Sequence, residues 1–220
     1  MKQENDPESI RENYDRLAKD YALKIYGELE HKPLDRELLT RFAADAKGCG
    51  RICDMACGPG HVTRFLRDAG ADVFGLDLSP QMLAQARALN SDISFREGNM
   101  LALELESASL AGITAFYAIV NIPAASLPAV FAEMFRVLQQ GGLLLLAFHI
   151  GDEVLRPEEL WGNRIGIDFY QLQPHRIEHL LTEAGFAIDD VVERDPYPDI
   201  EFQSRRAYVF AQKPTDPAGV

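Results

Sequence analysis

Continuous apolar runs divide the middle of this chain into short buried strands, and helix-length segments separate them. Strands are predicted at residues 51–56, 71–77, 93–97, 112–117 and 143–149. Helices are predicted between them at residues 61–69, 79–89 and 127–139. Strands that are apolar throughout, without polar alternation, are typical of a parallel sheet covered on both faces. The pattern therefore predicts an α/β fold with a doubly wound, mostly parallel sheet.

Elements at both ends extend this core. Helices are predicted after Asp6-Pro7 and at residues 34–46, then a helix at 174–184 and strands at 186–193 and 207–212, the last antiparallel. We interpret 1–220 as a single domain, with a helical cap at 1–48, a cofactor-binding core at 49–149 and a C-terminal helix and strand pair at 174–213. Residues 150–173 have no clear period and are expected either to cover the acceptor as a lid or to be a structural excursion. Residues 214–220 are expected to be a frayed tail.

Composition limits the possible partners. The net charge of −12, from 22 basic and 34 acidic residues, disfavours nucleic acids and anionic membranes as partners. No apolar run reaches the roughly 18–20 residues that span a bilayer. Cys49, Cys53 and Cys57 have the spacing of neither a zinc site nor a disulfide, so we expect reduced thiols, no metal and a cytoplasmic location. The oligomeric state stays open.

A glycine turn between the first strand and its helix carries the candidate chemistry. Gly58 and Gly60 lack a Cβ, so a ligand can approach the backbone, and Asp77 follows at the distance where an acid accepts ribose hydroxyls. A dinucleotide site would have a third glycine where this chain has Thr63, and Asp54 would repel a pyrophosphate. Asp54 is instead expected to favour a positively charged adenosyl compound.

Four segments in order resemble the motifs of class I S-adenosylmethionine-dependent methyltransferases of the small-molecule type. They are DMACGPG at 54–60, GLDLSPQM at 75–82, FREGNM at 95–100 and RVLQQGG at 136–142. The resemblance implies a Rossmann-like fold with seven strands and N-terminal helices, and S-adenosylmethionine as the cofactor. It also implies a set of cofactor-binding residues: Tyr14, Tyr21, Asp54, Ala56, Cys57, Gly58, Gly60, Asp77, Leu78, Met82, Asn99, Met100 and Tyr117.

The chain departs from the family pattern at three places. Ala56 stands where glycine is usual, so its methyl group is expected to crowd the methionine end of the cofactor. Asn99 stands where aspartate is usual, and its amide oxygen is still expected to accept from the adenine amino group. Many relatives have a histidine near Val120-Asn121; here Tyr117 and Asn121 are interpreted as ligand-orienting residues.

Histidines supply the remaining candidates. His149, at the end of the fifth predicted strand, is the best-placed general base, although a structural role is the commoner one. His175, Glu178 and His179 match the H-x-x-E-H zinc pattern. Because Ile177, Leu180 and Leu181 are expected to supply the buried face of that helix, a solvated surface is expected for the histidines. The expected function is methyl transfer from S-adenosylmethionine to a small-molecule acceptor by in-line displacement. The alternatives are a non-catalytic adenosyl-ligand-binding protein and a dinucleotide-dependent oxidoreductase.

Overall fold

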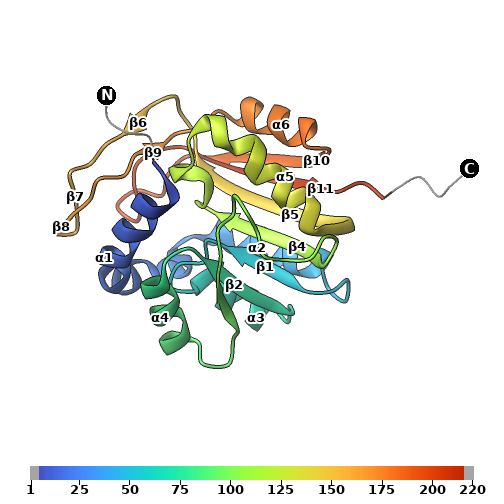
Figure 1. Ribbon diagram of the computed structural model, residues 1–220, viewed down its shortest axis with the longest axis horizontal. Helices are drawn as coiled ribbons and strands as arrows, with labels where there is room; N and C mark the ends of the chain where they lie inside the picture. Colours follow the sequence, from blue (N-terminus) through green and yellow to red (C-terminus); the bar gives the residue numbers. More distant parts are fainter. Residues whose placement is uncertain (1–4, 216–220) are drawn as a thin grey trace, which may run out of the picture.

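A computed structural model describes residues 5–215 of the chain. In this part of the chain, a seven-stranded sheet forms the centre of the molecule (Figure 1). The strand order is β10-β11-β5-β4-β1-β2-β3. The strands are β1 (Ile52–Met55), β2 (Val73–Asp77), β3 (Phe95–Glu97), β4 (Leu110–Phe116), β5 (Leu138–His149), β10 (Ala187–Arg194) and β11 (Arg206–Gln212). β1 to β5 pair in parallel, and β11 runs antiparallel to both β5 and β10. The predicted doubly wound fold is confirmed; of the tail predicted at 214–220, residues 216–220 lie outside the described residues.

Helices cover both faces of the sheet (Figure 1). On one face lie α2 (Pro33–Asp45), α3 (His61–Asp68) and α4 (Pro80–Leu89), and on the other lie α5 (Leu127–Val137) and α6 (Pro174–Glu183). Phe42 of α2 is fully buried in one apolar cluster, and Phe131 of α5 is fully buried in another. Burying an aromatic side chain of this kind stabilises the fold by about 1.5–3 kcal/mol. This two-sided burial is why the strands are apolar throughout.

Helix α1 (Pro7–Ile25) crosses the carboxyl edge of the sheet instead of covering a face. Its start is the predicted one, because the Asp6 side chain accepts a hydrogen bond from the Ser9 N–H at 2.8 Å. The Asp15 carboxylate accepts from the Ser79 hydroxyl at 2.6 Å and from the Gln81 N–H at 3.1 Å. A carboxylate at the first turn of α4 interacts favourably with that helix's dipole. α1 is therefore fastened where β2 ends.

The boundary between α5 and β5 differs from the prediction. The sequence places the helix end at Gly141-Gly142, but α5 ends at Val137 and β5 begins at Leu138. The reason is long-range pairing: the Gly141 N–H donates to the Lys213 carbonyl, and the Lys213 N–H donates to the Gly142 carbonyl. Gly141 has φ +74° and absorbs a shift in the strand register there. Its role is a bulge and not a helix cap.

The segment after β5 forms two short antiparallel pairs. β6 (Val154–Leu155) pairs with β9 (Phe169–Tyr170), and β7 (Glu159–Leu160) pairs with β8 (Asn163–Arg164). Three 3₁₀ helices complete the fold: η1 (Glu28–His31), η2 (Ile119–Asn121) and η3 (Ala124–Ser126). Within residues 5–215, no helix combines the length and apolar character needed to cross a bilayer.

Candidate functional site

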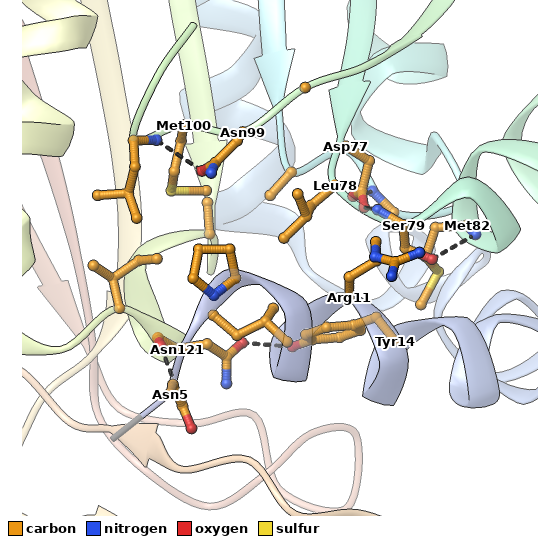
Figure 2. Close-up of a pocket in the computed structure, with 18 of the residues that line it drawn as sticks. Asn5, Arg11, Tyr14, Asp77, Leu78, Ser79, Met82, Asn99, Met100 and Asn121 are labelled. Carbon is orange, nitrogen blue, oxygen red and sulfur yellow. Dashed lines mark hydrogen bonds between the residues drawn. The ribbon is translucent and has the colours of Figure 1, made fainter. Parts of the chain in front are cut away.

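A cavity of about 250 Å³ lies between α1 and the carboxyl ends of β1, β2 and β4. Figure 2 shows its lining, with α1 along one side and the segments that follow β2, β3 and β4 around the rest. Parallel α/β sheets place their ligand sites at this edge. Ten of the predicted cofactor-binding residues line the cavity: Tyr14, Tyr21, Ala56, Gly58, Asp77, Leu78, Met82, Asn99, Met100 and Tyr117.

Asp77 is the buried charge of the cavity, with 8% of its surface exposed. Its Oδ2 accepts a hydrogen bond from the Gly58 N–H at 2.8 Å, and its Oδ1 accepts from the Ser79 N–H at 2.9 Å. Burial nevertheless raises the pKa of this carboxyl to about 6. The Leu78 backbone N–H also interacts with this carboxylate, whose four lone-pair positions still leave room for a ligand hydroxyl. Asp77 is therefore suited to hold a ribose.

Asp54 does not line the cavity, and its predicted direct contact with the ligand is not supported. Its side chain is turned into the protein, where the Thr63 hydroxyl donates to it at 2.6 Å and the Thr114 hydroxyl donates at 3.0 Å. Burial raises its pKa to about 6. The contact also explains why position 63 is not glycine, since the hydroxyl of Thr63 satisfies a fully buried carboxylate.

The two glycines of the turn have different roles. Gly58 (φ +52°) lies beneath Tyr21, and a Cβ placed on it would be 3.7 Å from that ring, so the position is open toward the cavity. Gly60 does not line the cavity. A Cβ on this residue would lie 2.9 Å from Phe95 and from the Asn90 amide. Gly60 is therefore required for packing at the start of α3, and its predicted contact with the ligand is not supported.

The two residues before Gly58 complete the turn. Ala56 lines the cavity with φ +55°, a left-handed conformation that costs a residue with a Cβ roughly 1–2 kcal/mol. This backbone shape explains why glycine is usual there. Cys57 is buried in a cluster with Leu83 and Phe95 and does not line the cavity, so the structure does not support it as a ligand contact.

The far end of the cavity is apolar. Leu78, Met82 and Met100 line it, which fits the predicted adenine position. The Asn99 Oδ1 already accepts a hydrogen bond from the Leu101 N–H at 2.9 Å (Figure 2). This oxygen has two lone pairs, so one remains for the adenine amino group and the predicted contact stays a prediction.

Three tyrosine rings line the other end. Tyr14 and Tyr21 of α1 meet edge to face with their ring centroids 6.1 Å apart, and Tyr117 follows β4. Burial raises the pKa of each of these hydroxyls above its ordinary value, so all three stay protonated. Tyrosine faces attract cations within about 6 Å of the ring centre. The Tyr117 ring already has the Lys32 Nζ 5.6 Å and the Arg206 guanidinium 5.9 Å from its centroid, so Tyr14 and Tyr21 are the rings that favour a positively charged ligand group.

His149 does not line the cavity, and its predicted role as a general base is not supported. Its ring lies behind Tyr117 at a centroid distance of 4.9 Å, and its Nδ1 is 2.7 Å from the Ser204 hydroxyl. Burial, reinforced by the nearby Arg206 charge, lowers the pKa of His149 to about 3. An imidazole with so low a pKa is a weak base, so its position is structural.

The H-x-x-E-H pattern on α6 does not form a metal site in the described part of the chain. His175 and His179 are exposed, and the His179 Nε2 lies 3.4 Å from the Glu183 carboxylate of the same helix. Among the residues that the structure describes, no cluster of three or more potential metal ligands is found. The expected solvated surface is confirmed for this helix.

Sequence reasoning missed the polar contacts that join α1 to the cavity rim. The Asn121 Oδ1 accepts a hydrogen bond from the Tyr14 hydroxyl at 2.7 Å, and the Asn5 Nδ2 donates to the Asn121 carbonyl at 2.9 Å (Figure 2). The Asn5 and Asn121 amides both also donate to the Asp168 carbonyl. Ile10 and Arg11 line the cavity from α1 too. The only available signal was the apolar stripe of α1, which does not say what the helix packs on.

Comparison with known proteins follows this geometry. Residues 52–142 match a family model described as a methyltransferase domain. The chain is 30% identical over 156 residues to a malonyl-[acyl-carrier protein] O-methyltransferase from Enterobacter lignolyticus, covering 71% of this chain and 59% of that protein. It is also 30% identical over 149 residues to a demethylmenaquinone methyltransferase from Beutenbergia cavernae, covering 66% and 59%. The chain thus spans about three fifths of these curated relatives.

Solved structures agree on the fold. The magnesium protoporphyrin IX methyltransferase from Synechocystis, solved with bound S-adenosylmethionine, superimposes with a TM-score of 0.72 over 96% of this chain and 98% of that one, at 17% identity. The domain match, the sequence relatives and the shared fold lead to one conclusion. Residues 52–142 of the chain are similar to a methyltransferase domain, and the chain has the fold of solved S-adenosylmethionine-dependent methyltransferases.

Proposed function

We propose that this chain transfers a methyl group from S-adenosylmethionine to a small-molecule acceptor. The observation that carries the proposal is the pairing, in one cavity, of the Asp77 carboxylate with the rings of Tyr14 and Tyr21. A ribose needs a hydroxyl acceptor, and a sulfonium needs a face that favours positive charge. The named activities of the sequence relatives, which include methylation of a quinone precursor, support the same reaction class.

The cavity fits this cofactor better than a dinucleotide. Arg11 is the one basic residue among the described residues that line it, and it lies at the partly exposed rim. The Gly58 N–H, which would bind a pyrophosphate in a dinucleotide site, already donates to Asp77. A diphosphate would therefore meet a buried carboxylate, and only Arg11 at the rim offsets this charge among the described residues that line the cavity.

The residues of the chain would divide the work as follows. Asp77 would accept from the ribose hydroxyls, and Leu78, Met82 and Met100 would enclose the adenine. S-adenosylmethionine, when bound, supplies a methyl group on a positively charged sulfur that is already activated for in-line displacement. Tyr21 would exclude water from the reacting end and favour its charge. Alignment and desolvation would then carry most of the rate, so no dedicated base is assigned.

The test is formation of S-adenosylhomocysteine by the purified protein with S-adenosylmethionine and a panel of phenols, carboxylic acids, amines and thiols. Turnover with one acceptor class, lost in Asp77→Asn, supports the proposal. Tight cofactor binding without turnover on any acceptor would favour the non-catalytic adenosyl-ligand-binding protein. A cytoplasmic location is part of the proposal and is supported by the three free cysteines.

A further inference from the structure

The hairpin of β7 and β8 carries a residue that its turn does not call for. Leu160 pairs with Asn163, and the two residues between them, Trp161 and Gly162, have φ values of +51° and +83°. A two-residue turn with both central φ values positive favours Asn-Gly, Asp-Gly or Gly-Gly. Tryptophan at the first of these positions is strained. Local structure therefore does not explain why the residue is tryptophan.

The contacts of its ring do explain it. The Trp161 ring meets the Tyr21 ring edge to face at a centroid distance of 5.7 Å. Tyr21 lines the cavity above Gly58, whereas Trp161 does not line the cavity and keeps 38% of its surface exposed. Tyr14, Tyr21 and Trp161 thus form a row of rings that leads from the cavity to the surface. The outermost ring, Trp161, is partly exposed to solvent.

The hairpin is fixed in this position against α1 (Figure 1). The Asn163 Nδ2 donates to the Asp20 carboxylate at 2.8 Å, and the Gly166 N–H donates to the Asn13 Oδ1 at 2.9 Å. Both acceptors belong to α1. Because two hydrogen bonds to α1 fix residues that follow the turn, the ring of Trp161 is preorganised beside Tyr21.

We propose that Trp161 is the acceptor-recognition residue of the chain, and that the acceptor carries a planar aromatic ring. The proposal rests on the methyl-transfer function above, since the glycine turn beneath Tyr21 marks the reacting end. Trp161 is a single aromatic face between the exposed charged residues Glu159 and Arg164. A flat ring with polar substituents fits such a face, whereas an aliphatic chain requires a long apolar groove.

Intrinsic fluorescence tests this directly, because Trp161 is the only tryptophan in the chain. The full-length protein, saturated with S-adenosylhomocysteine, is titrated with hydroquinone and with its saturated counterpart cyclohexanediol, then with hydroxybenzoate and hydroxycyclohexanecarboxylate. We expect saturable quenching by the aromatic members, with a Kd about tenfold lower than for the saturated ones, since ring pairs add to simple area burial. Equal binding of both members of each pair overturns the proposal.

Variants separate recognition from structure. Trp161→Asn suits the turn, so its Tm should equal or exceed that of the wild type, and its affinity for S-adenosylhomocysteine should stay within about twofold. Calorimetry should show that it loses about tenfold in affinity for the aromatic probes, and that Trp161→Phe recovers most of this. Leu23→Ala, an exposed apolar change on α1, should alter neither affinity.

Two results would overturn the assignment. One is that Trp161→Asn binds the aromatic probes as the wild type does. The other is that its Tm and its S-adenosylhomocysteine affinity fall together, which would make Trp161 only a cover for Tyr21. Failure of the methyl-transfer proposal is a separate result: aromatic probes would still bind at Trp161, but no acceptor would yield S-adenosylhomocysteine.

Discussion

The Gly58 N–H donates a hydrogen bond to the Oδ2 of Asp77 across 2.8 Å, which joins the turn after β1 to the end of β2. The glycine turn is thereby held by the same carboxylate that faces the cavity. Both strands must end at the same level of the sheet for this contact, and their register, with Met55 beside Leu76, provides it. Cofactor binding and the shape of the turn therefore depend on one side chain.

Replacement of Asp77 should accordingly weaken cofactor binding strongly. Asp77→Ala is expected to lower affinity for S-adenosylhomocysteine more than about tenfold, because two ribose hydroxyls lose a charged acceptor. Isothermal titration calorimetry measures this, with Asp92→Asn as the matched control, since Asp92 is exposed and pairs with Arg64. An unchanged affinity in Asp77→Ala would remove Asp77 from the binding site.

Cofactor affinity should also depend on pH. Because burial raises the pKa of Asp77 to about 6, the charged acceptor forms only as the pH rises through 6. Affinity for S-adenosylhomocysteine is expected to increase about tenfold between pH 5 and pH 7. The same titration on Asp77→Asn should be nearly flat, and an equally steep profile in that variant would place the titrating group elsewhere.

Stability linked to Asp77 should change in the opposite direction. An unfolded carboxyl at the ordinary pKa of 3.8 loses its proton before the native one does. Between about pH 4 and pH 6 the native state therefore holds more protons, and the free energy of unfolding contributed by this group falls as the pH rises. The free energy of unfolding, measured with urea at several pH values across this range, should fall less steeply with pH in Asp77→Asn than in the wild type.

Thr63 should matter for stability and little for the cofactor. Thr63→Val removes a hydroxyl that donates to the buried Asp54 carboxylate, and is expected to lower the free energy of unfolding by about 1–3 kcal/mol. Thr63→Ser, which keeps the hydroxyl, is the control and should lose less. Urea unfolding gives the free energy of unfolding, and calorimetry gives the affinity for S-adenosylhomocysteine. A large loss of cofactor affinity in a folded Thr63→Val would restore Asp54 to the binding site.

Replacement of Ala56 by glycine should raise both the stability of the protein and its affinity for the cofactor. Ala56→Gly relieves a left-handed alanine but increases the freedom of the unfolded chain, so a net gain of about 0.5–1 kcal/mol in stability is expected. Ala108 has the same φ of +55° and is exposed outside the cavity, which makes Ala108→Gly a matched control. Both changes should stabilise the chain, and only Ala56→Gly should tighten cofactor binding. Equal cofactor affinity in all three proteins would show that the Ala56 methyl does not crowd the ligand.

The fold could be predicted because its determinants are local. Apolar runs, the Asp6 cap and the glycine turn each act within a few residues, and the strands and helices lie close to where the pattern placed them. The predicted end of α5 was wrong because Gly141 takes its conformation from pairing with Lys213, which is distant in the sequence. That the whole chain is one domain stays a prediction.

The site was predicted less well, since side-chain direction depends on distant partners. Asp54 turns away from the cavity because Thr114, on the neighbouring strand β4, donates to it. Asn5 and Asn121 reach the rim only once α1 has docked across the sheet edge. The position of Asp77 in the cavity lining could be predicted because it follows from the end of its own strand, and its contact with the cofactor stays a prediction.

Calorimetry with competing ligands tests the preference for a cationic adenosyl compound most directly. The purified wild-type protein is titrated at pH 7 or above with S-adenosylmethionine and, separately, with NAD. S-adenosylmethionine should bind at least about a hundredfold more tightly, because the cavity offers the Asp77 carboxylate and the rings of Tyr14 and Tyr21, and within residues 5–215 its lining contains no buried cation for a diphosphate. Tight binding of NAD, with none of S-adenosylmethionine, would contradict this assignment of the cavity.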